Sequence, residues 1–160
     1  MGYTHYFTIK KGPRGKAAQS EAKYQKAVLE CTKMIQFYSK TFGGLSGYSA
    51  HSNKYQGINV NGSERVGQCE PFILREHLSQ NEAFGFVKTR QYPYDTVVTA
   101  CLIVLKHRLG ELIEISSDGN ADNFNDGLIL ARSVLGLKRI ALPTSLRPNL
   151  KQPVGTIIAV

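Results

Sequence analysis

A short basic segment directly before an apolar stretch is the most distinctive local feature of the sequence. Lys88 and Arg90 stand shortly before Pro93, a residue that suits the first turn of a helix. A helix N-terminus presents unpaired N–H groups and partial positive charge, which bind phosphate or carboxylate. The segment therefore predicts an anion site made of Lys88, Arg90, Tyr94 and Asp95, in which the last two donate their backbone N–H groups. The alternative is a plain strand-to-helix turn, with Asp95 as the helix cap.

A second polar cluster lies between an expected strand and an expected helix. Asp118, Asn120 and Asp122 alternate as in the first half of a calcium-binding loop. Asn123 stands where that loop needs glycine, however, and an isoleucine stands where it needs glutamate. The sequence therefore favours a turn at Asp118 and a helix cap at Asp122 over a metal site made of Asp118, Asn120 and Asp122.

The two clusters would share one crevice if the helices that follow them lie side by side on a sheet. Basic Lys88 and Arg90 would then face acidic Asp118 and Asp122 across it. Crevices of this kind are the usual ligand sites of open α/β sheets. We therefore expect a ligand near Lys88 and Asp118.

Catalysis has only weak candidates in this sequence. Glu70, Asp95 and Asp118 would bind a divalent ion in a metal-assisted phosphoesterase or nuclease, but their spacing matches no motif. The four histidines share no metal-binding spacing, and His5 is expected to be a hydrogen-bonded core residue. No P-loop, Gly-x-Ser-x-Gly or Gly-x-Gly-x-x-Gly segment occurs, so no cofactor is expected. A non-enzymatic binding protein is favoured, with the metal-assisted enzyme as the alternative.

Positive charge is concentrated in the first third of the chain. The net charge is +8, and residues 1–54 hold nine Lys and Arg residues against two Glu. Apolar residues at spacings of three and four predict a helix over residues 17–42, with Lys26, Lys33 and Lys40 opposite its apolar stripe. The turn before this helix adds further basic residues, Lys10, Lys11 and Arg14.

This lysine ridge, Lys26, Lys33 and Lys40, is either a solvated helix face or a surface for a polyanion. No RRM, KH or helix-turn-helix signature accompanies it. The expected partners are therefore a nucleic acid, a nucleotide or a host protein.

The remaining periodicities predict an α+β domain over residues 1–136. Strands are expected over residues 3–9, 58–60, 71–74, 83–88 and 112–116. Helices are expected over residues 17–42, 93–108 and 122–135. The second helix is apolar almost all round, which predicts a central, buried position. This order favours a single mixed sheet with about three helices packed on it.

Residues 137–160 are expected to form an extended tail. Pro143, Pro148 and Pro153 exclude a long helix there, and residues 155–160 are apolar and rich in β-branched side chains. Such an ending needs cover from its own sheet edge or from a neighbouring chain. The regular proline spacing suits an extended segment that contacts a neighbouring chain, which favours a homo-oligomer joined through the tail.

The chain is expected to stay in the cytoplasm. Its longest apolar run, residues 97–105, is too short to span a bilayer, and its opening lacks the apolar core of a signal peptide. Cys31, Cys69 and Cys101 have neither disulfide-framework nor zinc-site spacing, which fits a reducing compartment.

Several short motifs resemble a family of small phage and bacterial proteins that open Met-Gly-Tyr-Thr-His-Tyr. The motifs are residues 1–7, Asn61-Gly62, Glu70 with Phe72, Lys88-Thr89, Pro93-Tyr94-Asp95, and Ser117-Asp118-Gly119 with Phe124. The similarity runs in patches to about Gly136, and relatives carry Trp where this chain has Phe7 and Phe124, and Cys where it has Val87. The resemblance implies a phage or prophage gene acting in the host cytoplasm, and it implies no particular activity.

Overall fold

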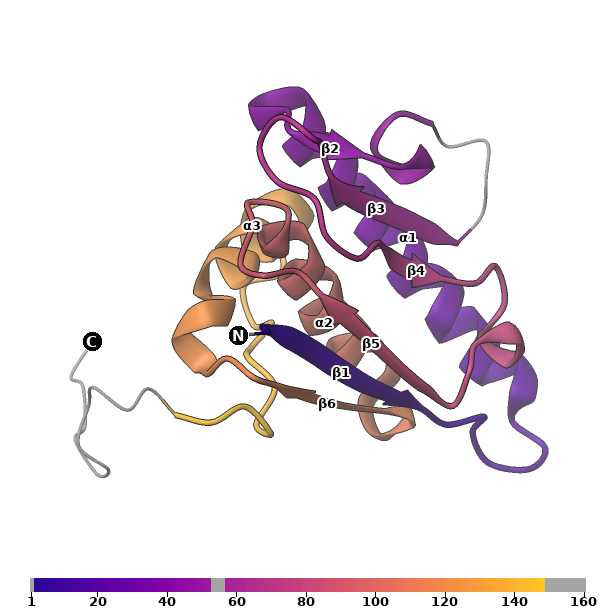
Figure 1. Ribbon diagram of the computed structural model, residues 1–160. Helices are drawn as coiled ribbons and strands as arrows, with labels where there is room; N and C mark the ends of the chain where they lie inside the picture. Colours follow the sequence, from indigo (N-terminus) through magenta and orange to yellow (C-terminus); the bar gives the residue numbers. More distant parts are fainter. Residues whose placement is uncertain (1, 53–56, 149–160) are drawn as a thin grey trace.

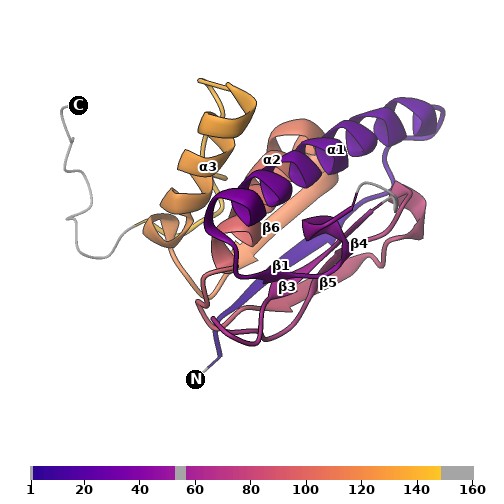
Figure 2. The ribbon, with the colours of Figure 1, turned by 90° about the horizontal axis from the view of Figure 1, so that it is seen from above.

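The strands of this protein form one layer, and the helices lie together on one side of it (Figures 1 and 2). The structure is a computed structural model that describes residues 2–52 and 57–148. The strands are β1 Thr4–Ile9, β2 Leu45–Ser46, β3 Ile58–Gly62, β4 Phe72–Leu74, β5 Phe84–Lys88 and β6 Ile113–Ser117. The helices are α1 Ala17–Phe42, α2 Asp95–Leu109 and α3 Asn125–Leu135. Four short 3₁₀ turns complete the described elements, η1 Tyr48–Ala50, η2 Leu78–Gln80, η3 Gly110–Leu112 and η4 Ala121–Phe124.

The α+β class is confirmed, but the expected single mixed sheet is wrong. The described strands form two antiparallel sheets of three strands, ordered β5-β1-β6 and β2-β3-β4. Edge strands β4 and β5 lie side by side (Figure 1), and the Glu70 N–H donates to the Lys88 carbonyl at 3.0 Å. Because β4 is only three residues long, this edge does not continue into a full ladder.

Helix α2 is the centre of the core, as its all-round apolar sequence predicts. Every residue from Val97 to Leu105 is buried. Helices α1 and α3 both pack against it. Gly127 of α3 lies against Thr99 of α2 so closely that a Cβ at this position would overlap the Thr99 hydroxyl and the Ala100 backbone. The glycine therefore sets how near α3 approaches α2.

The packed part of the chain continues past Gly136. Ile140 is fully buried, and its carbonyl accepts two hydrogen bonds from the Arg132 guanidinium at 3.2 and 3.0 Å. The Arg147 carbonyl accepts a hydrogen bond from the Ala121 N–H at 2.8 Å. The apolar ending over residues 155–160, on which the oligomer prediction depends, lies outside the described residues.

Within the described ranges, none of the helices combines the length and apolarity that a membrane crossing requires.

Candidate functional site

A chain of buried hydrogen bonds connects β1, α2 and β6. His5 is fully buried; its Nε2 lies 2.6 Å from Asp95 Oδ1, and its Nδ1 lies 2.8 Å from Ser117 Oγ. Thr89 Oγ1 donates to the same Asp95 oxygen at 2.6 Å. With Asp95 ionised, Nε2 of His5 carries the proton and the Ser117 hydroxyl donates to Nδ1. The expectation that His5 is a hydrogen-bonded core residue is confirmed.

This chain has the residue types of a serine-hydrolase triad, but its setting is structural. In a hydrolase the serine oxygen must be open to substrate. Here Ser117 Oγ already accepts a hydrogen bond from the Gly119 N–H at 2.9 Å, and His5 has no exposed surface. Neither residue lines the cleft described below. The chain therefore holds the first turn of α2 against the central strand β1.

The first turn of α2 does not offer the predicted anion site. The Asp95 N–H, expected to donate to an anion, instead bonds to the Tyr92 carbonyl at 2.8 Å. Tyr94 is fully buried, and its hydroxyl donates to the Glu70 carbonyl at 2.7 Å. The Asp95 carboxylate faces His5 rather than capping the helix. Both the Asp95 N–H donor and the Asp95 cap are therefore wrong, because the Tyr92 carbonyl accepts from the N–H within the turn and the carboxylate is bonded to His5.

Lys88 and Arg90 precede this turn, and the Lys88 carbonyl accepts a hydrogen bond from the Tyr94 hydroxyl at 3.2 Å. Lys88 ends β5, and its backbone N–H donates to Glu70 Oε2 at 2.8 Å. Arg90 is exposed and has a φ of 56°, followed by Gln91 with a φ of 59°. Two consecutive non-glycine residues in the left-handed region are uncommon and strained. They reverse the chain between β5 and α2, and neither Lys88 nor Arg90 lines the cleft.

A cleft does lie where the two N-terminal turns meet, but its charge differs from the prediction. It has a volume of about 340 Å³ and is lined by Tyr3, Gln91, Tyr92, Pro93, Asp95, Thr96, Asp122, Asn123 and Asp126. Three of these side chains are carboxylates and none is cationic. The expectation of basic Lys88 and Arg90 facing acidic Asp118 and Asp122 is therefore wrong for this cleft, of which only Asp122 is part.

The carboxylates of the metal-assisted alternative point to different partners. Glu70 accepts from the Lys88 N–H, and Asp95 is bonded to His5. Asp118 accepts from the Thr4 N–H at 3.1 Å and from the Tyr6 hydroxyl at 3.2 Å. Over residues 2–52 and 57–148, no three His, Cys, Asp or Glu side chains come together as metal ligands.

The calcium-like segment is a helix-capping turn. Asn120 Oδ1 accepts a hydrogen bond from the Asp122 N–H at 3.0 Å, and Asn123 Oδ1 accepts from the Asn120 N–H at 2.8 Å. This reciprocal pair is a capping box at the start of η4. The cap is therefore Asn120, and the prediction of Asp122 as the cap is wrong.

The lysine ridge lies on the outer face of α1, with Lys26, Lys33 and Lys40 all exposed. Two apolar side chains share that face, Leu29 at 59% and Phe37 at 45% exposure. Among the basic residues of the preceding turn, Lys11 and Arg14 are exposed, and Lys10 pairs with Glu114 at 3.0 Å.

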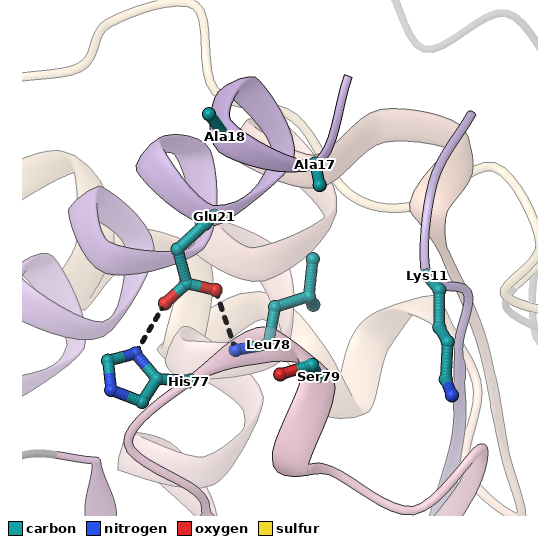
Figure 3. Close-up of a pocket in the computed structure, with 7 residues that line it drawn as sticks. All are labelled: Lys11, Ala17, Ala18, Glu21, His77, Leu78 and Ser79. Atoms are coloured by element: carbon teal, nitrogen blue, oxygen red, sulfur yellow. Dashed lines mark hydrogen bonds and ion pairs between the residues drawn. The ribbon is translucent and has the colours of Figure 1, made fainter. Parts of the chain in front are cut away.

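A second pocket, of about 370 Å³, lies where the N-terminal end of α1 meets η2 (Figure 3). Glu21 points from α1 toward η2. Its Oε1 lies 2.9 Å from His77 Nδ1, and its Oε2 accepts from the Leu78 N–H at 2.9 Å. Burial raises the pKa of Glu21, but hydrogen bonds from Gln25, His77 and Leu78 outweigh it, so the pKa lies below its usual value. These contacts fasten η2 to α1.

An exposed aromatic cluster on the strand layer was not anticipated from the sequence. Tyr6 of β1 pairs with Phe86 of β5, and the residue pairs on either side place Phe84 on the same face. Phe84 and Phe86 are 54% and 57% exposed. The Tyr6 and Phe84 ring centroids lie 6.3 Å apart with the rings nearly parallel, and those of Phe84 and Phe86 lie 6.2 Å apart. Tyr6 alternates along β1 with buried His5 and Phe7, so this aromatic face, Tyr6, Phe84 and Phe86, points away from the core. The helices lie on the other side of the strand layer (Figure 2).

The signal for this face was present in the sequence. Phe84-Gly85-Phe86 alternates two aromatic residues with glycine. Gly85 faces the core, where the Phe7 ring lies against its Cα and leaves no room for a Cβ. The period of two along a strand then turns Phe84 and Phe86 outward.

No family model, curated protein or solved structure matches this chain.

Proposed function

We propose that this protein binds single-stranded nucleic acid on its aromatic face, with bases stacked on Tyr6, Phe84 and Phe86. The observation that carries the proposal is that three neighbouring rings lie on the helix-free side of the strand layer, with Phe84 next to both Tyr6 and Phe86, and two of them are more than half exposed. Exposed aromatic clusters are uncommon on a surface that has no binding role. Bases stack on such rings with little regard to sequence, because every base has a π-face.

The positions of the rings support this function. In RNA-recognition motifs, aromatic side chains on two adjacent strands of an open sheet stack successive bases. Here the rings lie on β1 and β5, which are adjacent and antiparallel. The elements β1, α1, β4, β5, α2 and β6 also follow the β-α-β-β-α-β order, with β2 and β3 inserted before β4 and with β4 in the other sheet.

The sequence of β5 carries part of the corresponding signature. Residues 84–87, Phe-Gly-Phe-Val, match four consecutive positions of the RNP1 pattern. Glu82, Ala83 and Thr89 differ from that pattern, which explains why no full signature is found. The four matching residues include both exposed rings and the glycine between them, which faces the core.

Phosphate contacts would come from the two basic residues of the predicted anion site. Lys88 follows Phe86 on the same face of β5, and exposed Arg90 lies just beyond the strand. The net charge of +8 adds long-range attraction for a polyanion. Helix α1, whose outer face carries the lysine ridge, lies on the opposite side of the strand layer (Figure 2), so the ridge would not contact a strand bound to the aromatic face. Binding without catalysis also fits a phage accessory protein, the setting that the opening motif implies.

Fluorescence anisotropy with a labelled oligothymidine tests the proposal. Stacking on an aromatic side chain contributes about 1–3 kcal/mol per base, so Phe84→Ala with Phe86→Ala should weaken binding at least about tenfold. Phe86→Tyr should bind like the unaltered protein, because it keeps the ring. Phe42→Ala is the matched control, since Phe42 is also highly exposed, at 67%, but ends α1.

Two results would overturn the proposal. One is oligothymidine binding that the double alanine variant leaves unchanged while circular dichroism shows an intact fold. The other is an absence of binding to oligothymidine and to oligouridine at low salt, where electrostatic binding is strongest.

A further inference from the structure

The cleft between the first turns of α2 and α3 is a polar, acidic depression with no assigned role. Asp95 enters it from α2, Asp122 from η4 and Asp126 from α3. Its volume of about 340 Å³ lies within the range of small-ligand sites. Carboxylates in the first turn of a helix are favoured by the helix dipole, so the acidic residues alone have a sufficient structural reason.

Tyr3 adds an observation that helix stabilisation does not explain. Its side chain lines the cleft and is only 7% exposed. Its hydroxyl is the one buried side-chain polar atom without a hydrogen-bond partner in the part of the chain that the structure describes. Native proteins pair nearly all such groups, since an unpaired buried hydroxyl is costly. A ligand that forms a hydrogen bond with this hydroxyl would remove that cost.

The surroundings of the Tyr3 hydroxyl define the chemistry of such a ligand. The ring packs edge-to-face on His5, with centroids 5.0 Å apart, and the hydroxyl lies against Gly119. Burial raises the pKa of Tyr3, and the charges of Asp95 and Asp118 raise it further, so the group stays a neutral hydroxyl at physiological pH. Ser117 lies near enough to oppose part of this shift, but its Oγ makes its hydrogen bonds to His5 and Gly119 and forms none of normal geometry with the Tyr3 hydroxyl.

We infer that this cleft binds an organic cation, a guanidinium or primary ammonium group, between its carboxylates and the Tyr3 hydroxyl. Such a group brings only N–H donors, which suits carboxylate acceptors and the free lone pairs of a tyrosine oxygen. An anion would meet three carboxylates and no cationic side chain among the lining residues. Both hydrogen bonds that Asp95 accepts from His5 and Thr89 end on Oδ1, so its Oδ2 has capacity for the ligand. The site is separate from the aromatic face and does not depend on nucleic-acid binding.

Agmatine, which carries a guanidinium at one end and an ammonium at the other, is the first probe. In a titration followed by ¹H–¹⁵N NMR at low salt, we expect saturable shifts at Gln91, Thr96 and Asn123. Asp126→Asn, which removes one charge and keeps the shape, should weaken binding at least about fivefold. Glu64→Gln is the matched control, because it removes an exposed carboxylate away from the cleft. Asp126→Asn should leave oligothymidine affinity unchanged, which separates this site from the proposed function.

Tyr3→Phe gives the sharpest test because its two expected effects have opposite signs. Removing an unpaired buried hydroxyl should leave the melting temperature unchanged or raise it, while agmatine binding weakens several-fold. N-acetyl-arginine amide, titrated in parallel, distinguishes the source of the cation. Tighter binding of the amide indicates an arginine of a partner protein, and tighter binding of agmatine indicates a free polyamine.

Three outcomes would overturn the inference. These are no saturable shifts with either probe, equal affinity of the unaltered, Asp126→Asn and Tyr3→Phe proteins, and a marked fall in melting temperature of Tyr3→Phe. The last would mean that the hydroxyl is already engaged within the protein.

Discussion

His5 and Asp95 meet at 2.6 Å in the interior, where the imidazole is fully buried and the carboxylate side chain is 13% exposed. A carboxylate so far removed from water needs its hydrogen bonds, because an unpaired buried charge is strongly unfavourable. Asp95 receives them from β1 through His5 and from the turn before α2 through Thr89. The position of α2 on the central strand thus depends on a few polar atoms as well as on its apolar surface.

Asp95→Ala should therefore lower the free energy of unfolding by about 3 kcal/mol, since it leaves His5 without its partner. Urea denaturation measures this change. Asp118→Ala is the control: Asp118 also accepts two hydrogen bonds but is exposed, so its loss should cost less than about 1 kcal/mol. Equal losses in the two variants would show that the buried chain has no special role.

Salt dependence distinguishes the aromatic face from the lysine ridge as the nucleic-acid surface. Each phosphate neutralised on a single strand contributes about 0.7 to the slope of log K against log salt concentration. Lys88→Ala should lower this slope by about that amount, because Lys88 adjoins Phe86 on the proposed surface. Replacing Lys26, Lys33 and Lys40 together by glutamine should change the slope less.

The opposite result, a larger effect of the triple lysine variant than of Lys88→Ala, would assign nucleic-acid binding to α1. Abolished binding in the triple variant, together with an unchanged slope in Lys88→Ala, would move the site to the lysine ridge. Leu29 and Phe37 would then be the apolar contacts, since both are exposed on that face.

The contacts of Glu21 predict a pH-dependent contribution to stability. Because hydrogen bonds lower the pKa of Glu21 below its ordinary value of 4.5, its contribution is present above that pH and disappears as the pH falls through the lower, folded-state pKa. Glu21→Gln should thus melt at a lower temperature than the unaltered protein at pH 6, with the gap closing toward pH 3. Thermal melts across that range measure it. A gap that stays constant with pH would show that the charge of Glu21 contributes nothing.

The regular elements were largely predictable because their periodicities are local. The first helix was expected over residues 17–42 and is found at Ala17–Phe42, and the second, expected over residues 93–108, is found at Asp95–Leu109. Apolar spacing reports the buried face directly. The short strand β2 and the division into two sheets could not be predicted in this way, since they depend on pairing between distant residues.

The candidate sites were less predictable because side-chain direction decides them. The sequence predicted a crevice near Lys88 and Asp118, whereas the cleft is lined by Asp95 and Asp122, and the basic residues around the left-handed turn at Arg90 and Gln91 lie outside it. The Tyr3 hydroxyl gives no sequence signal, since only the fold shows that it lacks a partner. The aromatic face did have a signal, the alternation Phe84-Gly85-Phe86, which periodicity alone identifies as a strand without identifying its exposed face.

The prediction that the C-terminal residues join chains into an oligomer can be tested more cleanly with the fold in hand. Truncation after Leu142 would remove Leu146, which is buried, and Ser145, whose hydroxyl donates to the Ile115 carbonyl at 2.5 Å. That variant should melt at a lower temperature whatever its oligomeric state. Truncation after Pro148 keeps these contacts and removes only residues 149–160.

If residues 155–160 add a strand to a neighbouring chain, the full-length protein should show the mass of an oligomer in light scattering. The variant ending at Pro148 should then show the mass of a monomer, with a melting temperature at high dilution close to that of the full-length protein, because association stabilises only when chains are concentrated. An oligomeric mass that persists in the shortened variant would assign the interface to the described part of the chain, where the exposed rings of Phe84 and Phe86 are the first surface to substitute. A full-length protein that is monomeric at high concentration would exclude the exchange of C-terminal strands.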